Sequence, residues 1–230
     1  MFRFAGIQLG SGGIAPCLNC GAAEKEPYST ASVLAKSSHL SKDCSLQGFQ
    51  GVMFDGFEPF EHRGLVEIIT ESANSSFERI GIQTDGGALS SSDNTRGSIA
   101  AGVRVFEVVL TGGDARSHDE RTGIHGLFDA VVLGVENITA VSLQLGVSAT
   151  VVGIAAVCSH NITELPLIVG AFCRIGVDAI RVEIRSGGQV PQALAKQAYE
   201  IATPAGVALF GDGMTRLNGV RLYSVVEVGA

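Results

Sequence analysis

The 230-residue sequence contains no tryptophan and only three tyrosines. A chain so poor in these residues offers little aromatic surface on which nucleic-acid bases could stack. It also lacks an excess of basic residues, because 16 lysines and arginines stand against 23 aspartates and glutamates, for a net charge of −7. This balance argues against a DNA-coating surface, so we expect no DNA partner, although backbone amides can still bind a small anion.

Long apolar runs are also missing. The first ten residues, MFRFAGIQLG, form a short apolar run without the cleavage site of a signal peptide. We find no charge-free stretch of about 18 apolar residues, so no membrane span is expected. The five cysteines are odd in number and irregularly spaced. These features favour a cytoplasmic protein whose thiols are free or bind a metal.

What the chain has is a repeating pattern of β-branched apolar runs, each ending in a glycine or polar cluster and most followed by a helix-like segment. The runs recur roughly every 25 to 45 residues, close to the length of one β-α unit. They are FRFAGIQLG, GVMFDG, RIGIQTDGG, VRVFEVVLTGGD, SATVVGIAAVCSHN, DAIRVEIRSGG and GVALFGDG. The pattern predicts one α/β domain over residues 1–230, a partial (β/α)6 TIM-type barrel with parallel strands and one further strand. A doubly wound open sheet is the alternative.

Apolar periodicity and helix-forming residues predict helices between several of these runs. They cover Phe60–Ala73, Leu127–Leu145, Leu165–Cys173 and Pro191–Thr203. A capping box is expected in which Asn161 caps the third of these helices and Glu164 closes the box. The polar run ARSHDER, residues 115–121, is predicted to be a solvated loop. In either architecture the functional site lies at the carboxyl ends of the strands.

Two cysteines, Cys17 and Cys20, follow the first predicted strand. Thiolates at this spacing can hold a metal ion or an iron–sulfur cluster, and the same spacing also serves redox dithiols. Alone, the pair does not decide between these chemistries.

The motifs around the cysteine pair resemble those of the radical S-adenosylmethionine (radical SAM) superfamily. Cys17 and Cys20 match the last two cysteines of its C-x-x-x-C-x-x-C loop, and Gly13 stands where the first would be. Gly56-Phe57-Glu58-Pro59 resembles the G-G-E-P motif, and Thr84-Asp85-Gly86 resembles T-N-G. His118-Asp119, followed by T-G-x-x-G-x-F, is similar to the fourth-strand region of many members, and the likeness runs from about residue 4 to about residue 186.

The resemblance implies a [4Fe-4S] cluster on Cys17 and Cys20, and reductive cleavage of S-adenosylmethionine to initiate hydrogen abstraction from an unknown substrate. The residues it implies for cofactor binding are Gly56, Glu58, Asp85, Glu107 and Asn161. It suggests no particular catalytic residue, and leaves open a protein or peptide partner. Gly13 cannot bind iron, and Phe57 is expected to crowd a closely approaching ligand.

Two other functions remain open. The chain could be a cluster-deficient relative that acts as a binding or partner subunit, or a cluster-free barrel enzyme that binds a phosphorylated metabolite at Gly10–Gly13 or Gly187-Gly188. Single residues also have simpler interpretations, because Glu58 suits a helix start, Asp85 a turn and Asn161 a helix cap. Arg181 and Arg185 are expected to point into the barrel and meet a carboxylate.

Overall fold

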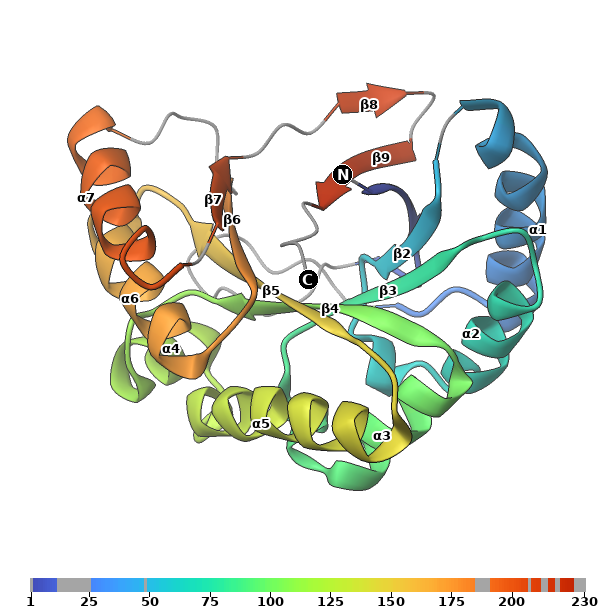
Figure 1. Ribbon diagram of the computed structural model, residues 1–230, viewed down its shortest axis with the longest axis horizontal. Helices are drawn as coiled ribbons and strands as arrows, with labels where there is room; N and C mark the ends of the chain where they lie inside the picture. The colour runs from blue at the N-terminus through green and yellow to red at the C-terminus, as the bar shows by residue number, and fades with distance from the viewer. Residues whose placement is uncertain are drawn as a thin grey trace.

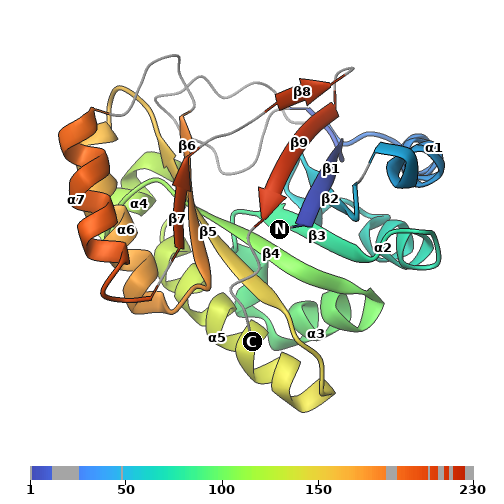
Figure 2. The same ribbon diagram turned by 45° about the horizontal axis from the view of Figure 1, so that its top comes forward.

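The computed structural model describes residues 2–11, 26–47, 49–184, 191–206, 208–211, 215–217 and 220–225. Within them, nine strands form one sheet in the order β7-β6-β5-β4-β3-β2-β1-β9-β8. The first seven run parallel, whereas β9 is antiparallel to β1 and β8 is antiparallel to β9. The sheet curls into a half-barrel with the helices on its outside, and β8 and β9 extend it beyond β1 (Figures 1 and 2).

The elements alternate along the chain as β/α units. The strands are β1 (Phe2–Gln8), β2 (Gly51–Asp55), β3 (Arg79–Thr84), β4 (Val103–Leu110), β5 (Thr150–Val157), β6 (Ala179–Ile184), β7 (Ala208–Gly211), β8 (Thr215–Leu217) and β9 (Val220–Val225). The α-helices are α1 (Thr30–Gln47), α2 (Leu65–Ala73), α3 (Ser92–Ala101), α4 (Ala115–Thr122), α5 (Leu127–Leu145), α6 (Leu165–Ile175) and α7 (Gln192–Ala202). Short 3-10 helices are η1 (Pro59–Glu61), η2 (Gly87–Ser90) and η3 (Ile162–Glu164).

Side chains that alternate along each strand build two separate apolar clusters. The larger one, the outer core, joins strand residues such as Phe54 and Phe106 to helix residues such as Ile68 and Phe172. Gly153 is needed here, because a Cβ at this position would lie 2.6 Å from the Phe172 ring. The smaller cluster contains strand residues alone and therefore lines the concave side of the sheet, the lumen. Its members are Phe4, Met53, Val105, Val109, Val152, Ile154, Ala156 and Ala179.

The predicted partial barrel is confirmed, and each of the seven predicted runs contains a parallel strand. Helices α2, α5, α6 and α7 lie where the periodicity predicts them. The solvated loop predicted for residues 115–121 is wrong. These residues belong to α4, which begins in a capping box between Asp114 and Ser117 and buries His118. The antiparallel pair of β8 and β9 has no counterpart among the predicted elements.

Helix α5 is, among the described residues, the one helix long and apolar enough to cross a membrane, with a mean hydropathy of 1.3. This is weak evidence for a span, because a core helix of a soluble protein meets the same test. One face of α5 is buried in the outer core through Val131, Val135, Ile138 and Val141. The fold therefore accounts for its apolar character as packing.

Candidate functional site

The candidate site is the rim formed by the carboxyl ends of β1 to β6. Next to β1, two short stretches of chain are joined at the rim by an isolated antiparallel bridge between Gly10 and Pro27. The Ser11 amide donates to the Glu26 carbonyl at 2.8 Å, and the Glu26 amide donates to the Ser11 hydroxyl at 3.3 Å. The two residues that flank segment 12–25, Ser11 and Glu26, are therefore neighbours on this rim.

Gly13, Cys17 and Cys20 belong to segment 12–25 and lie outside the described residues. Within the described ranges, no group of three or more His, Cys, Asp or Glu side chains is placed to hold a metal ion.

Gly56 directly follows β2 and lies in the left-handed region, with φ of +79°. A Cβ at Gly56 would lie 2.9 Å from the side chain of Gln8 and 3.1 Å from the Gly10 carbonyl oxygen. The turn therefore requires glycine, and it brings bare backbone to the rim. The neighbouring Phe57 is 4% exposed and belongs to the outer core. Its side chain points into the outer core, while its Cβ lies 3.0 Å from where a Cβ at Gly10 would be, and the expectation that it crowds a bound ligand stays a prediction.

Glu58 connects the loop after β2 to the end of β3. Its Oε1 accepts from the Thr84 hydroxyl at 2.7 Å and the Phe60 amide at 3.3 Å, and its Oε2 accepts from the Asp85 amide at 2.8 Å. Burial, and then the nearby charge of Asp85, raise the pKa of Glu58 to about 8, although these hydrogen bonds oppose the rise. Glu58 thus both starts η1, as the simpler interpretation proposes, and positions Asp85.

Asp85 opens the turn before Gly86, where φ is +85°. Its Oδ1 accepts from the Gly87 amide at 2.8 Å, which is the contact expected of an aspartate in a tight turn. The Asp85 side chain is 8% exposed and lies beside Glu58 at the ends of β2 and β3. Structure and sequence therefore agree on its turn role.

Glu107 lies deeper, on the lumen face of β4. Its Oε2 accepts from Gln83 Nε2 at 3.0 Å and from Arg181 Nη2 at 2.8 Å. Burial raises the pKa of Glu107; Arg181 opposes this rise, whereas the charges of Glu183 and Asp55 add to it. The prediction that Arg181 points into the barrel and meets a carboxylate is confirmed, and Arg185 lies outside the described residues.

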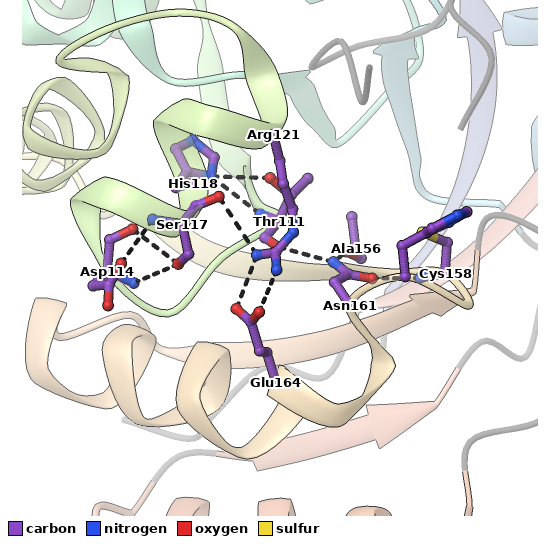
Figure 3. Close-up of polar contacts among 10 residues, drawn as sticks. Thr111, Asp114, Ser117, His118, Arg121, Ala156, Cys158, Asn161 and Glu164 are labelled. Atoms are coloured by element: carbon purple, nitrogen blue, oxygen red, sulfur yellow. Dashed lines mark hydrogen bonds and ion pairs between the residues drawn. The ribbon is translucent and has the colours of Figure 1, made fainter. Parts of the chain in front are cut away.

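Asn161 joins the ends of β4 and β5 (Figure 3). Its Oδ1 accepts from the Cys158 amide at 2.6 Å, and its Nδ2 donates to the carbonyls of Thr111 at 2.8 Å and Ala156 at 2.9 Å. The predicted capping box is wrong, because the Asn161 side chain makes no capping hydrogen bond to the following helix. Its amide instead holds two strand ends together.

A second set of contacts fixes the loop after β4 (Figure 3). The Thr111 amide donates to His118 Nδ1 at 3.1 Å, and Arg121 donates to the Thr111 carbonyl at 3.1 Å while pairing with Glu164 through two contacts. Burial lowers the pKa of His118 to about 4, and its ring packs edge-on against Phe128. This neutral histidine is part of a structural joint.

The structure thus divides the predicted cofactor residues into three places. Gly56, Glu58 and Asp85 lie together at the ends of β2 and β3, Glu107 lies lower in the lumen, and Asn161 lies in the β4–β5 joint. Sequence reasoning missed Gln83, whose position on the lumen face follows from its spacing of two residues from Gly81 on β3, where the Met53 side chain of the lumen cluster lies.

The sequence matches no protein-family model and no curated protein. Solved structures do resemble it. SuiB of Streptococcus suis matches 90% of this chain with a TM-score of 0.65 and 13% identity, and has been solved with S-adenosylmethionine and with the precursor peptide SuiA. Methylornithine synthase, PylB, matches 95% of this chain, over 75% of its own, with a TM-score of 0.64 and 11% identity.

A third match is the radical S-adenosylmethionine methyltransferase TsrM from Kitasatospora setae, solved with cobalamin and a [4Fe-4S] cluster. It covers 79% of this chain and 36% of its own, with a TM-score of 0.53 and 14% identity. This chain spans 48% of the length of SuiB. At such low identity these matches establish a shared half-barrel fold, and chemistry has to be argued from the site.

Proposed function

We propose that this chain is a radical SAM-type protein that binds S-adenosylmethionine at the carboxyl ends of its strands. The observation that carries the proposal is the rim at β2 and β3, where Gly56 leaves bare backbone two residues before Glu58, whose carboxylate binds the Asp85 amide, on a fold shared with a structure solved with this cofactor. Asp85 would accept from a donor group of the cofactor, and the Gly56 backbone would allow close approach.

Glu58 and Asn161 contribute in a different way. Their polar atoms are used by the chain itself, Glu58 on the Asp85 amide and Asn161 across the β4–β5 joint. We therefore assign them the role of positioning the rim against which the cofactor lies.

The proposed [4Fe-4S] cluster would be held by Cys17 and Cys20, with an exogenous ligand in place of a third thiolate. Such a cluster would supply the electron for reductive cleavage of S-adenosylmethionine. Both cysteines belong to segment 12–25, and its described neighbours Ser11 and Glu26 lie at the same rim as Gly56. A cytoplasmic location and a protein or peptide partner remain part of the proposal, the latter because a structural neighbour was solved with a precursor peptide.

Anaerobic reconstitution with iron and sulfide tests the cluster. EPR of the reduced protein should show a [4Fe-4S] signal that shifts when S-adenosylmethionine is added, and the Cys17→Ala/Cys20→Ala variant should retain no iron. Gly13→Cys should raise iron retention. The absence of iron in both wild type and Gly13→Cys would sink the enzyme proposal.

Equilibrium dialysis of the iron-free protein with radiolabelled S-adenosylmethionine tests the second candidate, a binding or partner subunit. Gly13, which has no side chain to bind iron, favours this candidate. Binding that persists without iron and weakens in Asp85→Asn would support it, whereas no binding with or without iron would reject both candidates.

A further inference from the structure

A polar row crosses the lumen at one level of the sheet. Gln8 of β1 pairs in register with Asp55 of β2, and Gln83 of β3 pairs with Glu107 of β4. Because Phe54 pairs with Ile82, Asp55 and Gln83 are also neighbours, so amide and carboxylate alternate across four strands. Gln8 is exposed, whereas the other three side chains are at most 4% exposed. The row therefore leads from solvent into the interior and ends at Glu107.

Glu107 has one oxygen that the chain does not use. Both of its hydrogen bonds, from Gln83 and Arg181, reach Oε2. Its Oε1 is fully buried and has no hydrogen-bond partner among the residues that the structure describes. A buried acceptor without a donor costs about 1–3 kcal/mol, and more when it is charged, so its retention suggests that a bound group supplies the donor.

The surroundings of this oxygen narrow the chemistry of that group. Toward the amino ends of the strands the lumen is filled by Phe4, Met53 and Val105, and the Met53 side chain lies over Gly81. A group bound at Glu107 therefore has to extend the other way, toward the rim. On that side of Glu107, β4 and β5 provide an apolar lining, whereas Arg181 and Glu183 of β6 lie level with Ile154 and Ala156.

The residues that form this apolar lining are Val109, Ile154 and Ala156. They suit an alkyl chain rather than a sugar or a phosphate. The negative charges of Asp55 and Glu183 act on Glu107, and the Arg181 guanidinium is the opposing positive charge. A bound ammonium would add a second positive charge beside Glu107 and would offset the negative charges of Asp55 and Glu183.

We propose that Glu107 Oε1 binds the primary ammonium group of an aliphatic amine substrate, whose alkyl chain packs on Val109, Ile154 and Ala156. This assignment rests on the proposed function and gives Glu107 to the substrate rather than to S-adenosylmethionine. Glu107 lies two residues below Val109 on β4, while the cofactor residues Gly56 and Asp85 lie beyond the strand ends. Gln83 and Arg181 are positioning residues that fix the carboxylate through Oε2.

The test measures the binding of three small probes to the whole wild-type chain by isothermal titration calorimetry. n-Butylammonium carries the charge and N–H donors, butyltrimethylammonium carries the charge without a donor, and n-butanol carries one neutral O–H donor without a charge. For so small a probe, n-butylammonium should bind with a Kd on the order of 1–10 mM. The other two should bind at least about tenfold more weakly, the worth of one charged hydrogen bond. Equal binding of all three, or no binding of n-butylammonium, would overturn the proposal.

The variant Glu107→Gln removes the charge but keeps the shape of the side chain, and it should weaken the binding of n-butylammonium about tenfold or more. The control variant Glu71→Gln, on the exposed face of α2, should leave this binding unchanged. If Glu107→Gln fails to fold, the three-probe comparison still decides. Dialysis with S-adenosylmethionine on the same samples separates the two ideas. If the wild-type protein binds S-adenosylmethionine but not n-butylammonium, this inference alone is refuted. If it binds n-butylammonium but not S-adenosylmethionine, only the proposed cofactor site is refuted.

Discussion

Replacing Glu58 with glutamine should remove a loss of stability that the wild-type protein shows at neutral to alkaline pH. The fold raises the pKa of Glu58 from 4.5 to about 8. A raised pKa means that its contribution to stability is fully present below pH 4.5 and is lost as the pH rises through 8. From pH 6.5 upward the remaining loss amounts to about 2 kcal/mol, because one pKa unit corresponds to about 1.4 kcal/mol.

His118 has the opposite effect. The fold lowers its pKa from 6.5 to about 4, so its contribution is present above pH 6.5 and is lost as the pH falls through 4. Between pH 4.5 and 6.5 the two slopes, each about 1.4 kcal/mol per pH unit, oppose each other. In this pH window the pH dependences of the two groups' contributions to the free energy of unfolding therefore cancel in the wild type. The Glu58→Gln variant keeps only the His118 contribution, so it should lose stability as the pH falls.

The assay is guanidinium denaturation, followed by far-UV circular dichroism, at half-unit steps of pH. The matched control is Glu61→Gln, an exposed glutamate in the same 3-10 helix, which should keep the wild-type profile. The quantity of interest is the difference between variant and wild type at each pH, because other titrating groups cancel in it. If the wild-type and Glu58→Gln curves run parallel above pH 6.5, the reasoning about Glu58 is refuted.

Three further substitutions test the site. Arg181→Met should lower the free energy of unfolding by about 3–5 kcal/mol, and adding Glu107→Met should recover most of the loss; an unchanged single variant would contradict this. Gly56→Ala should cost about 1–3 kcal/mol in the same denaturation assay, whereas Gly97→Ala, in open space on α3, should stabilise. Asn161→Leu should lose at least about 2 kcal/mol, measured as a lower denaturation midpoint, and a neutral result would dismiss its joint role.

The sequence predicts the barrel well because buried parallel strands are apolar on both faces. The run VRVFEVVL contains β4 for this reason, and the length of the units predicts the parallel topology. Apolar patterning does not predict helix α4, because most of its residues are polar. Its stability comes from the Asp114–Ser117 capping box and from burying His118 and Thr122, which composition does not reveal.

The candidate site is less predictable. Alternation along β4 correctly puts Glu107 and Val109 on the same face, but the partner Arg181 lies 74 residues away and is chosen by register across the sheet. Asn161 has the residue type and spacing of a helix cap, yet three competing backbone partners at the ends of β4 and β5 use its amide instead. Such choices depend on tertiary neighbours that a single sequence does not contain.

The bridge between Gly10 and Pro27 has a consequence for how the chain can change. Backbone hydrogen bonds hold the two ends of segment 12–25 together, so the closure of that stretch is independent of the side chains between them. Doubling the length of a flexible loop adds only about 0.6 kcal/mol to its closure entropy. Changes in the length or sequence of the stretch between Ser11 and Glu26 are therefore expected to leave the barrel strands in place.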